Sequence, residues 1–205
     1  MFFLQVHPQW FNGIDAIDKR LFYAINTGTS NNFFDALLPF VRESTVWAPL
    51  YLFFLIFAVV NFGKKGWVWF LFGICTAAIG DIVSSRLIKE NIFRLRPCRD
   101  PEISDAMNFL VTYCPQSSGF TSSHATNHFG MAVFIVSTLS FFTGKWIRLI
   151  FLWAFVVCYA QVYVGVHYPL DVICGGLLGA LIGTAVAKVF NNYVGLSSLQ
   201  IKPAR

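Results

Sequence analysis

Charged residues are scarce in this chain: Asp, Glu, Lys and Arg make up 12% of its 205 residues, whereas hydrophobic residues make up 56%. A soluble domain carries about 25% charged residues. The shortage therefore excludes an ordinary soluble domain and predicts an integral membrane protein with a single domain. The net charge of +5 does not indicate a nucleic-acid partner, because the cations stand between apolar runs and report topology instead.

Metal-binding patterns are also lacking, as is the composition typical of a leader segment at the start of the sequence. No basic segment precedes an apolar run at the N-terminus, and Asp15 and Asp18 come early, so we expect no cleavable signal peptide. His128 follows His124 by four residues, but no His-Glu-x-x-His motif or nearby third ligand accompanies them. We therefore expect no metal and no other cofactor, and interpret His128 as a packing residue.

Long apolar runs are abundant. Five segments are expected to cross a membrane, the first being marginal in length: 46–62, 67–88, 123–143, 147–166 and 169–190. The predicted fold class is all-α, a polytopic membrane helix bundle with its helical core at 46–190. Residues 1–45 are predicted to be an N-terminal amphipathic region, and 191–205 a tail.

The N-terminal region has the periodicity of an interfacial helix. Between residues 10 and 26, apolar residues recur every three or four positions, with Asp15, Asp18 and Lys19 between them. Residues 33–41 are apolar but too short to span, since about 20 residues are needed, and are expected to form a half-inserted or packing helix. The pattern leaves open whether the first helix crosses the membrane or lies on it.

Basic residues predict the orientation of the bundle. The positive-inside rule assigns three groups to the cytoplasm: Lys64 and Lys65, Lys145 and Arg148, and Lys188, Lys202 and Arg205. The 90–122 loop then lies outside, where Arg94, Arg96 and Arg99 break the rule and indicate an anion site. Cys98 and Cys114 bracket most of this loop and are expected to form a disulfide in an oxidising compartment; two free thiols are the alternative.

Three polar clusters meet at the outer ends of the second, third and fifth expected spans. They are Lys89-Glu-Asn-Ile-Phe-Arg-Leu-Arg96-Pro97, Thr121-Ser122-Ser123-His124 and Gln161-Val-Tyr-Val-Gly-Val-His167-Tyr-Pro-Leu-Asp171. One helical turn separates His167 from Asp171, so the carboxylate can fix the imidazole tautomer and raise its basicity. Backbone N–H groups opening the third span, together with Lys89 and Arg96, can cradle a phosphate.

Two further features surround these clusters. Asp81 lies on the same helix face as Ser85, eight residues before Lys89. An acidic residue within a span is costly, so Asp81 is expected either to support the site or to form a buried hydrogen bond between helices. Glycines of the last span suggest close helix packing: Gly175, Gly176, Gly179 and Gly183.

The order and spacing of the clusters resemble the type 2 phosphatidic acid phosphatase superfamily of membrane lipid-phosphate phosphatases. Its motifs are Lys-x6-Arg-Pro, Pro-Ser-Gly-His and Ser-Arg-x5-His-x3-Asp, and the matched core runs from about 67 to 190. The matching positions are Lys89, Arg96, Pro97, Ser122, His124, His167 and Asp171. The departures are Thr121 for Pro, Ser123 for Gly, Ala160 for Ser and Gln161 for Arg.

The resemblance implies a metal-independent hydrolase with a covalent intermediate. His167, oriented by Asp171, would attack phosphorus, His124 would protonate the leaving oxygen, and water would hydrolyse the phosphohistidine. The residues expected to hold the phosphoryl oxygens are Lys89, Arg96, Ser122, Ser123 and Gln161. Because Gln161 supplies no positive charge, Arg94 or Arg99 is hypothesised to replace the missing clamp in space.

The resemblance also implies a lipid phosphate as substrate, in a bacterial inner membrane with the site facing the periplasm or exterior. Undecaprenyl diphosphate is the first substrate expected, followed by phosphatidylglycerol phosphate and the lipid A phosphates. A lipid phosphotransferase and a low-turnover lipid-phosphate binder are the alternatives. A transporter is disfavoured because the spans show no inverted repeat. The sequence does not specify an oligomeric state.

Overall fold

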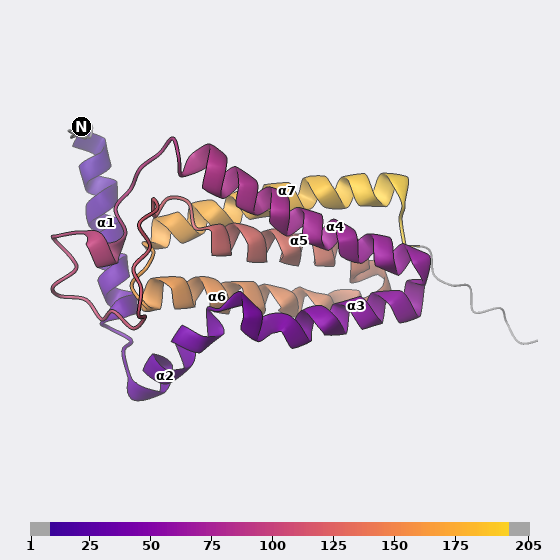
Figure 1. The fold of residues 1–205 in the computed structure, drawn as a ribbon, viewed down its shortest axis with the longest axis horizontal. Coiled ribbons are helices and arrows are strands. Elements are labelled where there is room, and N and C mark those ends of the chain that lie inside the picture. Colours follow the sequence, from indigo (N-terminus) through magenta and orange to yellow (C-terminus); the bar gives the residue numbers. More distant parts are fainter. Residues whose placement is uncertain (1–8, 197–205) are drawn as a thin grey trace, which may run out of the picture.

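The computed structural model describes residues 9–196, and over this range the chain is all-α (Figure 1). The predicted tail is therefore described only as far as residue 196, and the rest of it lies outside the described residues. The helices of the bundle are α3 (Ala48–Phe62), α4 (Lys64–Ile82), α5 (Ser123–Thr143), α6 (Ile150–Tyr163) and α7 (Pro169–Tyr193). Two further helices precede them, α1 (Gln9–Asn26) and α2 (Asn32–Val41).

Within residues 9–196, four helical segments are long and apolar enough to cross a membrane: Ser44–Phe62, Lys64–Ile88, Ser123–Tyr163 and Pro169–Tyr193. The third has 41 residues, about twice the ~20 needed for one crossing. It turns back at the 3-10 segment η4 (Gly144–Leu149), so that α5 and α6 lie side by side along the bundle (Figure 1). The five predicted passes are thus made by four segments, and α6 ends earlier than predicted because residues 164–168 form a turn.

Helices α5 and α7 make the closest pair of the bundle, because glycine lets their backbones touch. A Cβ added at Gly179 would collide with the carbonyl oxygen of Thr126, and one at Gly183 with that of Gly130. The prediction that these glycines serve helix packing is confirmed. This contact holds the first turns of α5 and α7 together, and those turns carry His124 and Asp171.

Helix α1 is amphipathic as predicted, and it stands across the end of the bundle (Figure 1). Its apolar residues Ile17 and Leu21 stay exposed, whereas Asp18 and Phe22 on another face are buried against the protein. Phe22 packs edge-on against Tyr168 with ring centroids 5.5 Å apart. Polar residues of α1 therefore reach the bundle beside the start of α7.

The two ends of the bundle differ as the charge pattern predicts. The α3–α4 turn, η4 and the end of α7 lie at one end, while α1, α2 and the 90–122 loop lie at the other (Figure 1). The disulfide expected in that loop is confirmed, since Cys98 and Cys114 are bridged with their Cα atoms 6.2 Å apart. Of the α2 side chains, Leu38 is buried against α6, so α2 is a packing helix.

Candidate active site

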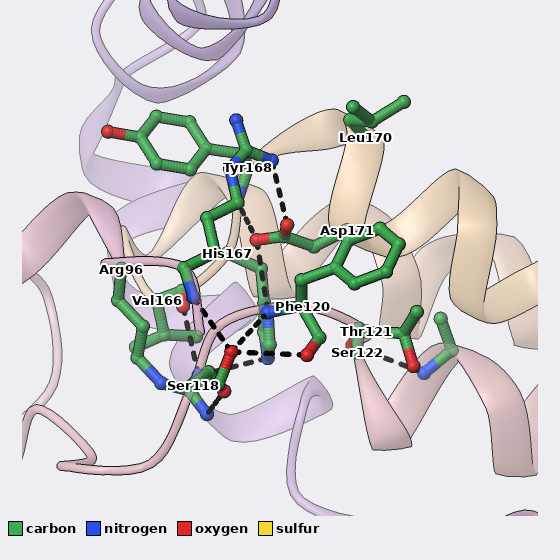
Figure 2. A network of polar contacts seen from close by, with 12 residues as sticks. Arg96, Ser118, Phe120, Thr121, Ser122, Val166, His167, Tyr168, Leu170 and Asp171 are labelled. Carbon is green, nitrogen blue, oxygen red and sulfur yellow. Dashed lines mark hydrogen bonds and ion pairs between the residues drawn. The ribbon is translucent and has the colours of Figure 1, made fainter. Parts of the chain in front are cut away.

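His167 lies in the turn between α6 and α7, where it is 2% exposed. Gly165 makes the turn with a φ of +88°, a conformation that other residues rarely adopt. The imidazole Nδ1 lies 3.5 Å from Asp171 Oδ2, and Nε2 lies 3.0 Å from Arg96 Nη1. Figure 2 shows His167 between Asp171 on one side and Arg96 on the other.

These contacts select one form of the imidazole. Because an arginine only donates, Nε2 accepts from Arg96 and carries a lone pair, which leaves the proton on Nδ1 facing the carboxylate of Asp171. Burial lowers the pKa of His167 to about 4, although Asp171 acts in the opposite direction. At neutral pH the ring is therefore uncharged, and the lone pair on Nε2 points away from Asp171.

The carboxylate of Asp171 is held by the start of α7 and by Arg94, which in turn is bonded to α1. Its Oδ2 accepts from the backbone N–H of Tyr168 at 3.0 Å, which caps the start of α7. Its Oδ1 accepts from Arg94 Nη1 at 2.8 Å. The other terminal nitrogen of Arg94 donates to Asp18 at 2.7 Å and to Asp15 at 3.1 Å, both on α1.

Arg94 is consequently a partner of carboxylates. Burial alone would lower the pKa of Arg94, but the charges of Asp171 and Asp18 outweigh it and raise the value. The hypothesis that Arg94 replaces the missing phosphate clamp is wrong, because its guanidinium is already engaged. Arg99 Nη1 donates to the carbonyl oxygen of Gln116, and among the described residues no bond links Arg99 to Gln161.

Arg96 lies on the Nε2 side of His167 and is 4% exposed. Its guanidinium donates to the carbonyl oxygens of Ser117, Ser118 and Val166 at 3.0–3.2 Å. These partners are neutral, so no carboxylate balances the charge directly. Burial lowers the pKa of Arg96 to about 10, and its guanidinium lies beside His167 Nε2 with no direct carboxylate partner among the described residues.

Lys89 follows the π-helical segment η2 (Val83–Ile88) at the end of α4. Its ammonium donates to Ser123 Oγ at 2.8 Å, and that hydroxyl also contacts Ser84 Oγ at 3.0 Å and Ser85 Oγ at 3.2 Å. Burial, followed by the charge of Arg96, lowers the pKa of Lys89 to about 8. Ser123, which stands where the family motif has glycine, therefore ties Lys89 to the start of α5.

The same network includes Asp81, whose carboxylate accepts from Ser85 Oγ at 3.2 Å. Of the two roles considered for Asp81, the structure favours support of the site through Ser85 and Ser123.

Ser122 stabilises the backbone at the start of α5 and α7. Its side chain is the N-cap of α5, accepting from the N–H of Ala125, and its own N–H donates 3.0 Å to the carbonyl oxygen of Asp171. That N–H is already used, which removes it from the predicted phosphate cradle. The N–H groups of Ser123 and His124, in the first turn of α5, have no helical acceptor and can face an anion.

His124 and Arg42 complete the surroundings of the pocket, and Arg42 adds a positive charge. His124 lies close enough to His167 for their charges to interact. Arg42 caps the end of α2, and its charge interacts with those of both Arg96 and His124. Its Nε is buried without a hydrogen-bond partner among the described residues, 3.6 Å from the exposed Glu43 carboxylate.

Gln161 is fully buried on α6, and neither atom of its amide has a hydrogen-bond partner within residues 9–196. The structure therefore does not join it to Lys89, Arg96 or His167. A buried amide without a partner is costly, and its role as a phosphate ligand stays a prediction.

Several residues around the candidate site were not predicted from the sequence. Arg42 stands at the end of a helix too short to span, and Asp15 and Asp18 belong to no motif. The available signal was the unexplained cation Arg94 together with acidic residues three apart on α1, but nothing in the sequence pairs segments 76 residues apart. Across the described part of the chain, no group of three His, Cys, Asp or Glu side chains is arranged to hold a metal.

Comparisons with known proteins agree with this chemistry. The family model of the PAP2 superfamily matches residues 66–194. A lipid A 4'-phosphatase from Bacteroides thetaiotaomicron is 30% identical over 171 residues, which covers 82% of this chain and 74% of the relative. A lipid A 4'-phosphatase from Porphyromonas gingivalis is 28% identical over 178 residues, covering 85% of this chain and 73% of the relative.

Two solved structures are similar in fold. A transmembrane PAP2-type phosphatidylglycerolphosphate phosphatase from Bacillus subtilis matches with a TM-score of 0.68 at 23% identity, covering 89% of this chain and 88% of that one. LpxE from Aquifex aeolicus matches with a TM-score of 0.61 at 26% identity, covering 82% of this chain and 93% of that one.

Proposed function

Because the chain belongs to the PAP2 superfamily and is a membrane lipid phosphatase, we propose that it hydrolyses the 4'-phosphate of lipid A through a phosphohistidine at His167. Both relatives compared in sequence are lipid A 4'-phosphatases, which supports this lipid. Undecaprenyl diphosphate, the first substrate expected from the sequence, stays a prediction that these relatives do not favour.

The placement of His167 carries the mechanism. In the first step, the lone pair on Nε2 forms a bond to phosphorus while the bond from phosphorus to the lipid oxygen breaks. The leaving oxygen takes a proton from His124. Asp171 stabilises the positive charge that develops on the imidazole, because it faces Nδ1–H.

The second step returns the enzyme to its starting form. His124 takes a proton from water, the water oxygen bonds to phosphorus, and the bond from phosphorus to Nε2 breaks. Inorganic phosphate leaves and Nε2 recovers its lone pair. The protons balance over the two steps, because the one that His124 gives to the lipid is replaced by one from water.

The cations of the pocket bind the phosphoryl oxygens. Arg96 Nη1 donates to the same lone pair that must attack, so its guanidinium turns to the phosphoryl oxygens when a phosphate arrives. Lys89, which follows α4, supplies further donors to the phosphoryl oxygens, as do Ser123 and the first N–H groups of α5. Gln161 contributes an uncharged donor, and we assign the third cationic clamp to Arg42 because its Nε has only the distant Glu43 carboxylate and no hydrogen-bond partner among the described residues.

We place the site at the periplasmic face of the inner membrane. The cation groups at the opposite end of the bundle support this orientation by the positive-inside rule. The disulfide beside the site also supports an oxidising compartment.

The test is phosphate release by the purified full-length protein in detergent without divalent metal. Lipid A, undecaprenyl diphosphate, phosphatidylglycerol phosphate and phosphatidate are compared, each with wild-type and His167→Ala protein. We expect the fastest release from lipid A, loss of the 4'-phosphate by mass spectrometry, and no release by the variant. Faster release from another lipid would reject the substrate, and transfer of phosphate to an added lipid acceptor would identify a phosphotransferase.

A further inference from the structure

A cavity of about 470 Å³ lies between α3, α4 and α5. On α5 it begins at Asn127 and His128, one turn beyond His124, and ends at Phe134 and Ile135. This is about 12 Å along the helix axis, directed away from the phosphate site and along the bundle. Figure 1 shows α3 and α4 diverging from the turn that joins them toward the end that carries the site.

The walls of this cavity differ along its length. Away from the site they are apolar and aromatic, including Trp69, Phe70, Met131 and Phe134. Near the site, α4 and α5 contribute Asp81, Asn127 and His128. Such a cavity matches a hydrocarbon chain that carries a polar group close to its headgroup end.

The hydrogen bonding of His128 indicates which polar group a ligand in this cavity would carry. Its Nδ1 lies 2.8 Å from the carbonyl oxygen of His124, so Nδ1 carries the proton and Nε2 is an acceptor. The side chain is 3% exposed, and Nε2 is buried with no hydrogen-bond partner among residues 9–196. Buried acceptors are nearly always paired, so Nε2 calls for a donor supplied by a ligand.

Other hydrogen-bond acceptors near His128 could also take a donor from a ligand. Asn127 Oδ1 is buried without a partner in the described chain, and Asp81 adds a carboxylate acceptor. Trp69 Nε1–H already donates to Thr138. The ring of Trp153 lies tilted against His128 with ring centroids 4.8 Å apart, but the two make no hydrogen bond and Trp153 lies outside the cavity lining.

We propose that this cavity receives an acyl chain of the lipid phosphate and that His128 Nε2 accepts a hydrogen bond from a hydroxyl group on that chain. The inference rests on the proposed function, because the chain is anchored by the phosphate at His167. Lipid A carries 3-hydroxyacyl chains, whose hydroxyl lies near the sugar. Isoprenoid diphosphates have no such hydroxyl, so the contact selects lipid A over them.

The experiment compares two synthetic diacylglucosamine 4-phosphates, one with 3-hydroxytetradecanoyl chains and one with unsubstituted tetradecanoyl chains. Phosphate release by wild-type protein is expected to be about tenfold to a hundredfold faster, in kcat/KM, on the hydroxylated lipid, because the unsubstituted lipid leaves Nε2 unpaired. His128→Phe keeps a ring but removes the acceptor. We expect it to reduce this preference to about twofold, with release from the unsubstituted lipid retained.

Two controls complete the design. Met131→Leu alters the same cavity without touching an acceptor, and its preference should equal that of the wild type. His128→Gln, which again offers an acceptor, should recover part of the preference. Equal rates on both lipids in the wild type, or an unchanged preference in His128→Phe, would overturn the inference.

Binding separates this inference from the proposed function. The His167→Ala protein does not turn over, so equilibrium binding of the two lipids to it measures hydroxyl recognition alone. Tighter binding of the hydroxylated lipid supports the inference even if phosphate release fails and the proposed function is rejected. Equal binding overturns the inference even if lipid A is hydrolysed.

Discussion

Arg94 and Arg96 are separated by one residue, yet they serve opposite sides of His167. Arg94 donates to Asp171 on the Nδ1 side and has its charge neutralised by carboxylates. Arg96 donates to Nε2 and to backbone carbonyl oxygens, so its charge is left for a ligand. The pKa values follow this difference: carboxylates raise that of Arg94, whereas burial lowers that of Arg96 to about 10.

This contrast shows that two arginines of one loop can have different partners and different roles. On one side, an arginine builds a rigid support that joins α1 to the start of α7. On the other, Arg96 donates only to neutral groups, and we propose that it binds the phosphate. A residue that acts through Asp171 should affect the rate without affecting phosphate affinity, and this expectation separates the two sides experimentally.

The largest loss of activity is expected at His167, which contacts Asp171 through Nδ1 and Arg96 through Nε2. His167→Ala removes the atom that bonds to phosphorus, and phosphate release should fall by about 10⁴-fold or more. Initial rates on lipid A measure it, with thermal unfolding as the check that the fold is intact. Rates within about tenfold of the wild type would reject His167 as the nucleophile.

A matched pair of substitutions tests the comparison directly. Arg96→Lys loses the planar fork and should weaken inorganic phosphate binding about tenfold and kcat/KM about a hundredfold. Arg94→Lys loses the two separate terminal nitrogens that reach Asp171 and the carboxylates of α1, so kcat should fall about tenfold while phosphate affinity stays within about threefold. Isothermal titration with phosphate and steady-state kinetics distinguish them. Equal losses of phosphate affinity in both variants would show that the two sides are not distinct.

Arg42 is expected to bind the phosphate together with Arg96. Arg42→Gln is expected to reduce kcat/KM about tenfold, because one charged donor to the phosphate is lost. Gln161→Arg should preserve or raise turnover in the wild type and restore it in the Arg42→Gln background. Steady-state kinetics of the single and double variants measure this. If Gln161→Arg changes kcat/KM by the same factor with and without Arg42→Gln, the two positions do not share the clamp.

The smallest effect at neutral pH is expected at Lys89. Its pKa of about 8 predicts that kcat/KM falls as pH rises through 8, because the ammonium becomes neutral. The His167 pKa of about 4 predicts a fall as pH drops through 4, because the ring becomes protonated. Lys89→Arg should change the rate little at pH 7 and move the alkaline limb upward by more than one pH unit. A pH profile with an unmoved alkaline limb would assign it to another group.

The bundle and the centre of the site could be read from the sequence because both depend on short-range rules. Apolar runs of sufficient length must leave water, and their ends mark the spans. The His167–Asp171 pair needs only one helical turn, which Pro169 begins. The disulfide joins cysteines 16 residues apart in one loop.

The roles of Arg94, Arg42 and Asp18 could not be read in this way. Arg94 was hypothesised to bind phosphate because its charge was visible, but its partners on α1 were not. Burial raises the pKa of Asp18, and Arg94 partly offsets this. Such a buried pair forms only when α1 packs across the end of the bundle.

The amino-acid sequence by itself determined a membrane-spanning helical protein, the spacing of its catalytic motifs and the chemistry those residue types can perform. Only the tertiary structure decided which arginine faces which nitrogen of His167, and which acceptors line the cavity beside α5. The reason is physical: composition and helical periodicity act over a few residues. By contrast, whether an arginine contacts a carboxylate or the lone pair of His167 depends on how segments more than 70 residues apart pack together.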